Sequence, residues 1–284
     1  MPPETSLIPM NNWKIATTNA RGMNNPEKQQ DIIKWHQDNQ HTISIITETR
    51  LKPLTAQFLK KHHPEILQLH STDPNNPNGS GVAIIINRTL APHIHQISET
   101  AGRCITIHLK FAGKITLTIT GIYNQANKNK NTAHSITKHL QYHHQHSTHS
   151  IIGGDFNESI TKPRILLKWI KKMKYVNLAK IFKQTQIPTW SNGMTQSTID
   201  FIWTSHNLAI HTNQFTINST NHFFNSDHQA ISTKIDFTSI SQQIHPKLKR
   251  KRRKIFDLSN ISSDKWSQWQ SAITEQITQH PNQH

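Results

Sequence analysis

Apolar residues occur in short, often Ile-rich runs, separated by polar stretches that contain Pro, Asn and Gly. These runs predict β-strands at residues 13–18, 42–47, 66–70, 81–87, 104–111, 114–123, 150–153, 197–204, 208–218 and 228–237. Helical periodicity predicts helices at residues 27–39, 55–62, 131–144 and 163–174. Because strands and helices alternate in both halves, with several hairpins, we expect an α/β fold of two mixed sheets with helices outside.

The predicted helix 163–174 is amphipathic. Its apolar side is expected to consist of Ile165, Trp169, Ile170 and Met173. The opposite side carries Arg164, Lys168, Lys171 and Lys172. Two interpretations of this cationic side stay open: a solvated helix face, or contacts with the phosphates of a nucleic acid.

The composition changes after residue 237. Residues 247–254 are a basic run, and residues 257–277 predict a helix with Trp266, Trp269 and Ile273 at helical spacing. The two tryptophans favour a packing face over a base-stacking surface. We expect a flexible leader (1–12), one folded domain (13–237), a basic linker (238–255) and a helical tail (256–284). The basic run is a candidate nuclear localisation signal, nucleic-acid arm or plain linker, and nuclear localisation is the expectation.

The formal net charge of +16 and the pI near 10.0 predict attraction to polyanions. Asn, Gln, Thr and His are abundant throughout, which favours codon bias over a functional meaning. A histidine-rich segment has irregular spacing, and we interpret it as a solvated helix end rather than a metal cluster; it contains His139, His143, His144, His146 and His149.

Cys104 is the single cysteine, so neither an intramolecular disulfide nor a multi-cysteine zinc site can form. Its place in an alternating apolar run predicts a small core residue. No apolar stretch reaches the length of a membrane span, and residues 1–12 lack a secretory pattern. We therefore expect an intracellular protein without a membrane or disulfide partner.

Acidic, amide, tyrosine and histidine residues stand where predicted strands end. They are Asn19, Glu48, Tyr123, Asp155, Asn157, Asp200, Asp227 and His228. Each alone is a weak signal, because a Glu after a strand is usually solvated and an Asp-x-Asn is more often a turn. Their order along the chain, each at the end of an apolar run, raises the odds of a shared site.

Hydrolysis of a phosphodiester requires a cation on the phosphate, an oriented water and a donor for developing charge. Mg²⁺ prefers oxygen ligands and keeps several waters, so Glu48 is a suitable ligand. Asp155, beside two glycines, can hold or deprotonate the attacking water, and Asn157 can orient it. His228 can donate to a phosphate oxygen, with a carboxylate such as Asp200 fixing its tautomer and stabilising its charge.

The ordered motifs resemble those of the endonuclease/exonuclease/phosphatase superfamily, which includes DNase I and apurinic/apyrimidinic endonucleases. The resemblance covers residues 13–237 and includes Thr189-Trp190 and Ile199-Asp200-Phe201. It implies a four-layered α/β sandwich, two mixed β-sheets flanked by helices, and a Mg²⁺-dependent phosphodiesterase in which Mn²⁺ can substitute. Residues 19–22, Asn-Ala-Arg-Gly, are similar to LINE-type retrotransposon endonucleases, which implies nicking of double-stranded DNA to leave a 3′-hydroxyl.

The resemblance also implies a role for each matched residue. Glu48 resembles the principal metal ligand, Asn19 a supporting ligand and Asp227 a further carboxylate on the metal side. Tyr123 resembles the tyrosine that contacts the phosphate.

The remaining matches concern the water and the leaving group. Asp155 and Asn157 resemble the pair that handles the water, and His228 resembles the catalytic histidine with Asp200 as its acidic partner. The candidate substrate-binding residues are Arg21, Arg164, Lys168, Lys171 and Ser226.

Two departures from the family pattern matter. Arg21 stands where the repair enzymes carry an acidic residue, which puts a second metal carboxylate and abasic-site specialisation in doubt. After Tyr123 the usual Pro-Asn continuation is replaced, so either Asn124 or Asn127 can take the asparagine role.

Three functional hypotheses follow. The leading one is a Mg²⁺- or Mn²⁺-dependent endonuclease derived from a retrotransposon. The alternatives are a non-catalytic nucleic-acid binder descended from a transposon, and a phosphatase of the same superfamily. A binder selected only for charge would not need Glu48, Asp155 and His228 together, while the basic surface favours long nucleic acids over small phosphate esters.

Overall fold

A computed structural model describes residues 12–52, 63–111, 115–126, 130–145, 147–238 and 262–279. The chain divides into two compact units, Met1–Ile244 and His245–His284, and each is described by itself. The predicted helix 55–62, the basic run 247–254 and nearly all of the leader 1–12 lie outside the described residues.

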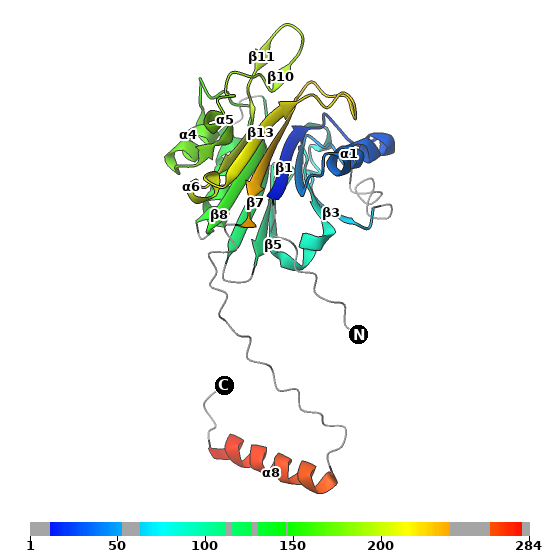
Figure 1. The fold of residues 1–284 in the computed structure, drawn as a ribbon, viewed down its shortest axis with the longest axis vertical. Helices are drawn as coiled ribbons and strands as arrows, with labels where there is room; N and C mark the ends of the chain where they lie inside the picture. Colours follow the sequence, from blue (N-terminus) through cyan, green and yellow to red (C-terminus); the bar gives the residue numbers. More distant parts are fainter. Residues whose placement is uncertain are drawn as a thin grey trace. The chain divides into compact units, whose positions relative to one another are not determined.

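The first sheet has six strands (Figure 1). In spatial order they are β13 (Thr212–Asn218), β14 (Ala230–Asp236), β1 (Asn12–Asn19), β2 (Ile43–Thr47), β4 (Val82–Asn87) and β3 (Ile66–Ser71). Strands β1 and β2 are parallel and the other pairs are antiparallel. The wholly apolar run Val82–Ile86 is buried, as expected for a central strand covered on both faces.

The second sheet is also six-stranded and mixed. Its spatial order is β5 (Ile94–Thr100), β6 (Cys104–Lys110), β7 (Thr116–Tyr123), β8 (His149–Asp155), β12 (Asp200–Thr204) and β9 (Val176–Asn177). Strands β7 and β8 are parallel, while β6–β7 is the predicted hairpin. Cys104 is fully buried, which confirms it as a core residue.

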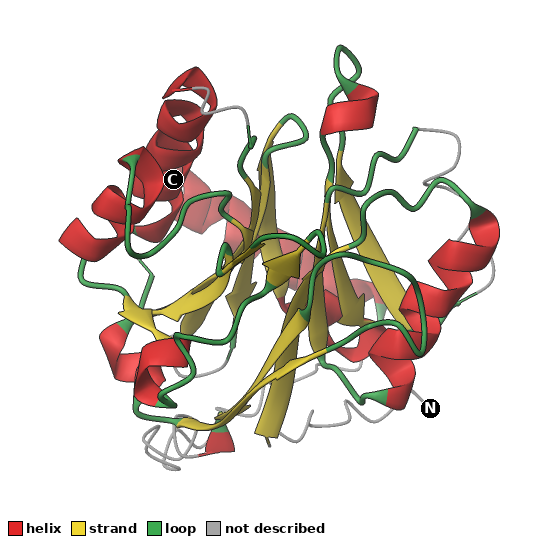
Figure 2. Cartoon of the chain, turned by 90° about the horizontal axis from the view of Figure 1, so that it is seen from above, coloured by secondary structure: helices red, strands yellow, loops and turns green. Residues whose placement is uncertain are grey.

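The two sheets pack face to face, and helices cover their outer faces (Figure 2). Helix α1 (Pro26–Asp38) packs on the first sheet through Ile32, Ile33 and Trp35. Helices α3 (Lys130–His144) and α4 (Ile165–Lys172) share a cluster with residues of β8 and β12 on the second sheet. The predicted four-layered α/β sandwich is therefore confirmed.

Short elements complete the domain: η2 (Pro77–Gly79), η3 (Arg88–His93), α5 (Leu178–Ile181), α6 (His206–Ala209), and the hairpin strands β10 (Trp190–Ser191) and β11 (Gln196–Ser197). The second unit contains α8 (Ser263–Gln279), in which Trp266 and Trp269 are 40% and 54% exposed. Within the described ranges, no helix combines the length and apolar character of a membrane span.

Several sequence predictions need correction. Leu208 and Ala209 lie in α6, not in a strand, because a single helical turn suffices to bury both. Strand β5 was not predicted, since this edge strand is mostly exposed and pairs with β6 without an apolar pattern. The buried side of α4 is formed by Leu166, Leu167 and Ile170, whereas Met173 is 46% exposed.

The interpretation of the histidine-rich segment as solvated was also wrong for two members. His139 and His144 are buried against the second sheet, where hydroxyl groups satisfy their ring nitrogens. For His144, the partners are Thr120 Oγ1 at 2.7 Å and the Tyr175 hydroxyl at 2.9 Å. Because these partners lie far away in sequence, composition alone pointed to solvent.

Candidate active site

The predicted site residues converge at one end of the sandwich. Most of the predicted catalytic and metal-binding residues line a pocket of about 330 Å³, called the catalytic pocket here, whose walls include Arg21, Glu48, Tyr123, Asp155, Asn157, Trp190, Asp227 and His228. Strands β1, β2, β7 and β8 all end at this pocket, and β12 and β14 begin next to it. The sheets approach closely here: a Cβ added to Gly121 would lie 2.8 Å from Ile45 Cγ2.

Asn19 links the two central carboxylates. Its Nδ2 donates to Oε2 of Glu48 at 3.0 Å and to Oδ2 of Asp155 at 2.9 Å. Its Oδ1 accepts the backbone N–H of Arg21 at 2.8 Å, which fixes the orientation of the amide. Asn19 therefore holds the carboxylates together, and its ligand role stays a prediction.

Glu48 and Asn157 have left-handed backbone conformations, with φ of 50° and 46°. Such conformations are uncommon for residues other than glycine and recur at functional sites. For Asn157, the turn lets its own N–H donate to Asp155 Oδ1 at 2.9 Å while Nδ2 donates to Asp155 Oδ2 at 3.0 Å. The Asp155-x-Asn157 motif is thus both a turn and part of the site.

Asn124, one of the two asparagines considered after Tyr123, lies beside the Asp155–Asn157 turn. Asn124 is buried, its side chain donates to the carbonyl of Phe156 at 2.9 Å, and its carbonyl accepts Asn157 Nδ2 at 2.7 Å. It buttresses the Asp155–Asn157 turn. Asn127 lies outside the described residues.

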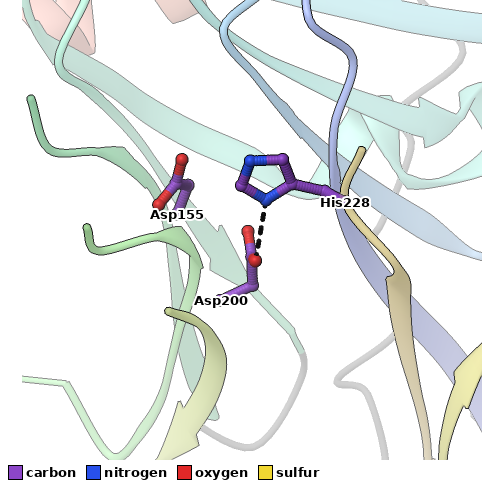
Figure 3. A group of neighbouring side chains, drawn as sticks. All are labelled: Asp155, Asp200 and His228. Atoms are coloured by element: carbon purple, nitrogen blue, oxygen red, sulfur yellow. Dashed lines mark hydrogen bonds and ion pairs between the residues drawn. The ribbon is translucent and has the colours of Figure 1, made fainter. Parts of the chain in front are cut away.

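His228 forms an ion pair with Asp200, as the sequence predicted (Figure 3). His228 Nδ1 lies 2.8 Å from Asp200 Oδ2, and the Thr189 hydroxyl donates to the same oxygen at 2.7 Å. Both His228 and Asp200 are buried. Asp155 lies close by, so that ligand atoms of Asp155, Asp200 and His228 all come within 4.8 Å of one another.

Burial and charge set the protonation of this cluster. Burial acts to lower the pKa of His228, but the Asp200 carboxylate, followed by Asp155 and Asp227, raises it to about 9. Burial raises the pKa of Asp155, and the Asp200 carboxylate raises it further. His228 is therefore a cationic donor at neutral pH, and Asp155 has an unusually high proton affinity for a carboxylate.

Tyr123 ends β7 with its side chain largely buried at the pocket. Burial raises its pKa, and the carboxylates of Glu48 and Asp155 raise it further. The phenol therefore stays protonated and can donate a hydrogen bond. Arg103 lies over the Tyr123 ring at 5.7 Å from the centroid, which fixes the ring from behind.

Asp227 is held on the other side of the pocket. Trp190 Nε1 donates to its Oδ2 at 3.1 Å, and Arg21 forms an ion pair with the same oxygen at 3.6 Å. Ser226 donates to the carbonyl of Asn19 at 2.7 Å and accepts the N–H of His228 at 3.1 Å. Ser226 thus ties the histidine loop to the end of β1.

Two of the predicted cationic residues, Arg164 and Lys168, line an adjoining pocket of about 350 Å³ at α4. This α4 pocket is lined by Asn124, Gln125, Lys130, Ala133, Glu158, Pro163, Arg164, Ile165 and Lys168. The Arg164 guanidinium donates to the carbonyl of Asn157, which connects the two pockets. Lys171 lines neither pocket.

Sequence reasoning missed two supporting residues. Arg50 forms an ion pair with Glu48. Glu158 is buried, and its two oxygens accept the N–H groups of Arg164, Leu166 and Leu167 at 3.0–3.1 Å, which anchors the start of α4. The sequence signal that could have identified them is their position, since Arg50 is two residues after Glu48 and Glu158 directly follows Asn157.

The donor set fits a divalent cation with hard oxygen ligands. Among the described residues, Asp227 Oδ1 and Asp200 Oδ1 are buried carboxylate oxygens without a hydrogen-bond partner. A buried carboxylate oxygen without a donor is costly unless a cation or water satisfies it. Glu48, Asp155 and Asp227 all line the pocket, which is the ligand chemistry that Mg²⁺ and Mn²⁺ prefer.

Comparisons with known proteins concern the fold and a part of the sequence. The family model described as endonuclease-reverse transcriptase matches residues 117–232. The endonuclease domain of TRAS1, a telomere-specific non-LTR retrotransposon, superposes with a TM-score of 0.59 at 12% identity, over 78% of this chain and 98% of that domain. No curated protein sequence matches the chain significantly.

Two further solved structures have similar folds. The AP endonuclease LMAP from Leishmania major has a TM-score of 0.64 at 12% identity, covering 80% of this chain and 89% of its own. The 3′ phosphatase NExo from Neisseria, bound to a product DNA hairpin, has a TM-score of 0.63 at 14% identity, covering 79% and 99%. At these identities the likeness concerns the fold.

Proposed function

We propose that this chain is a member of the DNase I-like endonuclease/exonuclease/phosphatase superfamily and that it is a divalent-metal-dependent phosphodiesterase that nicks DNA. The observation that carries the proposal is the convergence of Glu48, Asp155 and His228, which come from three distant parts of the chain, on one pocket. A family model for endonuclease-reverse transcriptases also supports an origin in a retrotransposon.

The side chains divide the work of hydrolysis by position. Asp155 accepts the proton of the attacking water, and Asn157, which donates to Asp155, restricts where that water can lie. His228, held by Asp200, donates its Nε2 proton to a phosphate oxygen as negative charge develops. Tyr123, at the end of β7, donates a hydrogen bond to a phosphate oxygen.

Glu48 is the proposed principal metal ligand, with Asp227 and Asn19 in support. A bound Mg²⁺ or Mn²⁺ would neutralise charge on the phosphate and the leaving oxygen. Arg50 and Arg21 form ion pairs with Glu48 and Asp227, so a bound metal ion would compete with these guanidinium groups for the two carboxylates. Arg21 in place of a carboxylate favours a single metal ion.

The substrate is proposed to be a polynucleotide because cationic pockets flank the catalytic pocket. On one side lies the α4 pocket, with Lys130, Arg164 and Lys168. On the other lies a pocket of about 360 Å³ lined by Arg21, Lys28, Asn225, Ser226 and Asp227, which shares Arg21 and Asp227 with the catalytic pocket. Consecutive phosphates of one nucleic-acid strand can occupy these three pockets, whereas a small phosphate ester needs only the catalytic pocket.

Two of the sequence expectations enter the proposal without structural support. The basic run 247–254 is proposed to direct the protein to the nucleus or to contact nucleic acid, and it lies outside the described residues. Lys171 is retained only as a peripheral phosphate contact, because it does not line the α4 pocket.

Nicking of supercoiled plasmid across a Mg²⁺ and Mn²⁺ series tests the proposal. Wild type and the control Asp38→Ala, an exposed carboxylate on α1, should nick equally, while Asp155→Ala should lose nearly all activity. Equal nicking by wild type and Asp155→Ala would refute the enzymatic assignment. Salt-sensitive binding without cleavage would favour the binder, and faster hydrolysis of a soluble inositol polyphosphate would favour the phosphatase.

A further inference from the structure

Histidines from α3 and the second sheet meet in a pocket that shares no residue with the catalytic pocket. This pocket of about 530 Å³, called the imidazole pocket here, is lined by residues that include His95, His108, Lys110, Thr118, Tyr142 and His143. His108 lies on β6 and His143 on α3, so the pocket lies between a helix and the sheet that it covers.

The two inner histidines present nitrogen atoms to each other. His108 Nε2 lies 3.1 Å from His143 Nδ1. Two imidazole nitrogens bound to one tetrahedral Zn²⁺ at ~2.0–2.1 Å lie about 3.3 Å apart. These two nitrogens form a hydrogen bond with each other, so a shared metal ion would replace that hydrogen bond. Both rings would turn slightly to direct their lone pairs at the ion as the nitrogens move apart by a few tenths of an ångström.

The rings are also held from behind. The other ring nitrogen of His108, Nδ1, hydrogen-bonds with Thr118 Oγ1 at 3.0 Å. The His143 ring packs against His139 and Tyr142, with centroid distances of 4.4 and 4.9 Å. Metal-binding histidines are commonly oriented by such a partner on the second nitrogen.

The electrostatics select the kind of cation. Burial, followed by His143, His95 and Lys110, lowers the pKa of His108 to about 4, and burial lowers the pKa of His143. A neutral imidazole carries one lone pair that can bind a metal ion at physiological pH, and the ion would displace the hydrogen bond that joins the two rings. No carboxylate is among the residues that line this pocket in the described structure, and Lys110 opposes any cation. The donors thus disfavour Mg²⁺ and Ca²⁺ and favour nitrogen-seeking transition metals.

We propose that His108 and His143 form a binding site for a transition-metal ion such as Zn²⁺, which ties α3 to β6 independently of the hydrolytic site. Elsewhere in the described structure, Asp155, Asp200 and His228 bring three ligand atoms within 4.8 Å. The imidazole pocket supplies two ligands as it stands. Water completes the coordination, or the exposed His95 side chain turns inward as a third ligand.

The test is Zn²⁺ titration of the untagged full chain in excess Mg²⁺, which occupies oxygen sites without competing for imidazole. Wild type, His108→Gln and His143→Gln are compared with His134→Gln, an exposed histidine on the same helix. Calorimetry gives affinity and stoichiometry. Thermal melts in EDTA and in Zn²⁺ separate metal binding from damage to the fold.

Wild type and His134→Gln should melt roughly 5–10 °C higher when Zn²⁺ is at about 100 times its Kd. Either pocket variant should bind about tenfold more weakly or worse and lose about half of this shift or more. If a glutamine variant has a lower melting temperature than wild type in EDTA, the fold itself is damaged, and His143→Cys is then used to test metal binding. Its thiolate can still bind the metal and adds a charge-transfer band with Co²⁺. Equal Zn²⁺ binding by all four chains, or binding by none, would overturn the proposal.

Discussion

The pairing of Asp200 with His228 gives a prediction that depends on pH. Asp200→Asn removes the charge that does most to raise the His228 pKa but preserves the shape of the side chain. Without that charge, burial still lowers the His228 pKa while Asp155 and Asp227 still raise it, so the pKa falls from about 9 toward the ordinary 6.5. A pKa of 6.5 would reduce protonation of His228 at a pH of about 8 from roughly nine-tenths to a few hundredths, so the donor form is lost by up to about 30-fold.

Orientation adds to this loss. The substituted asparagine would accept from the Thr189 hydroxyl as Asp200 does, yet its amide no longer fixes one tautomer of His228. In other histidine–carboxylate pairs the same substitution costs about 10⁴-fold. We therefore expect Asp200→Asn to lower kcat/KM for plasmid nicking by about 10²–10⁴-fold at a pH of about 8.

The pH dependence distinguishes this mechanism from simple damage. At a pH of about 6 an imidazole with an ordinary pKa is again mostly charged, so the ratio of wild-type to variant rate should shrink by at least about tenfold. Removing the Asp200 charge also lowers the pKa of Asp155, so the variant keeps an ionised Asp155 to lower pH than wild type does. This effect also reduces the ratio of wild-type to variant rate at acidic pH. Initial nicking rates across pH provide the measurement, with Asp38→Asn as the control. A rate ratio that is constant with pH would refute the reasoning.

Three further changes test other parts of the molecule. Gly154→Ala should lower the free energy of unfolding in urea by more than about 3 kcal/mol, since its Cβ would lie 2.0 Å from the Ile122 carbonyl at a φ of 136°. Glu158→Ala should cost about 2 kcal/mol in the same assay, because it leaves the first turn of α4 without its acceptor, while Glu158→Gln should cost less. Burial lowers the pKa of His144 to about 3, so the stabilising contribution of the neutral ring is complete above pH 6.5 and is lost as the pH falls toward 3. His144→Gln should therefore make the free energy of unfolding depend less steeply on pH in this range, by up to about 1.4 kcal/mol per pH unit.

The sequence was informative wherever burial left a pattern. Strands β2, β4 and β7 are buried along most of their length, so their apolar runs identified them. Strand β5 is held by ladder hydrogen bonds with β6, and its side chains are mostly exposed. Backbone pairing leaves no trace in side-chain hydrophobicity, which is why this strand was missed.

For the site, sequence order identified the residues but not how they are oriented. Asp200 and His228 were paired from the resemblance, and the structure brings them to 2.8 Å. Thr189 Oγ1, which accepts the N–H of Asp200 and donates to its carboxylate, could not be assigned that position from local sequence. For Glu158, its capping of N–H groups six to nine residues later follows no standard local motif.

Two buried histidines of this molecule differ in charge because the hydrogen-bond partner of each ring, rather than burial, determines its protonation. His228 and His144 are both buried, but the first faces Asp200 and the second faces a threonine and a tyrosine hydroxyl. A carboxylate stabilises the imidazolium and yields a proton donor, whereas neutral hydroxyls leave the desolvation cost uncompensated and keep the ring neutral. The abundance of histidine in this chain is therefore no guide to which histidine is charged. The acidic residues, which are only half as numerous as the basic ones, mark the histidine that we propose as the proton donor.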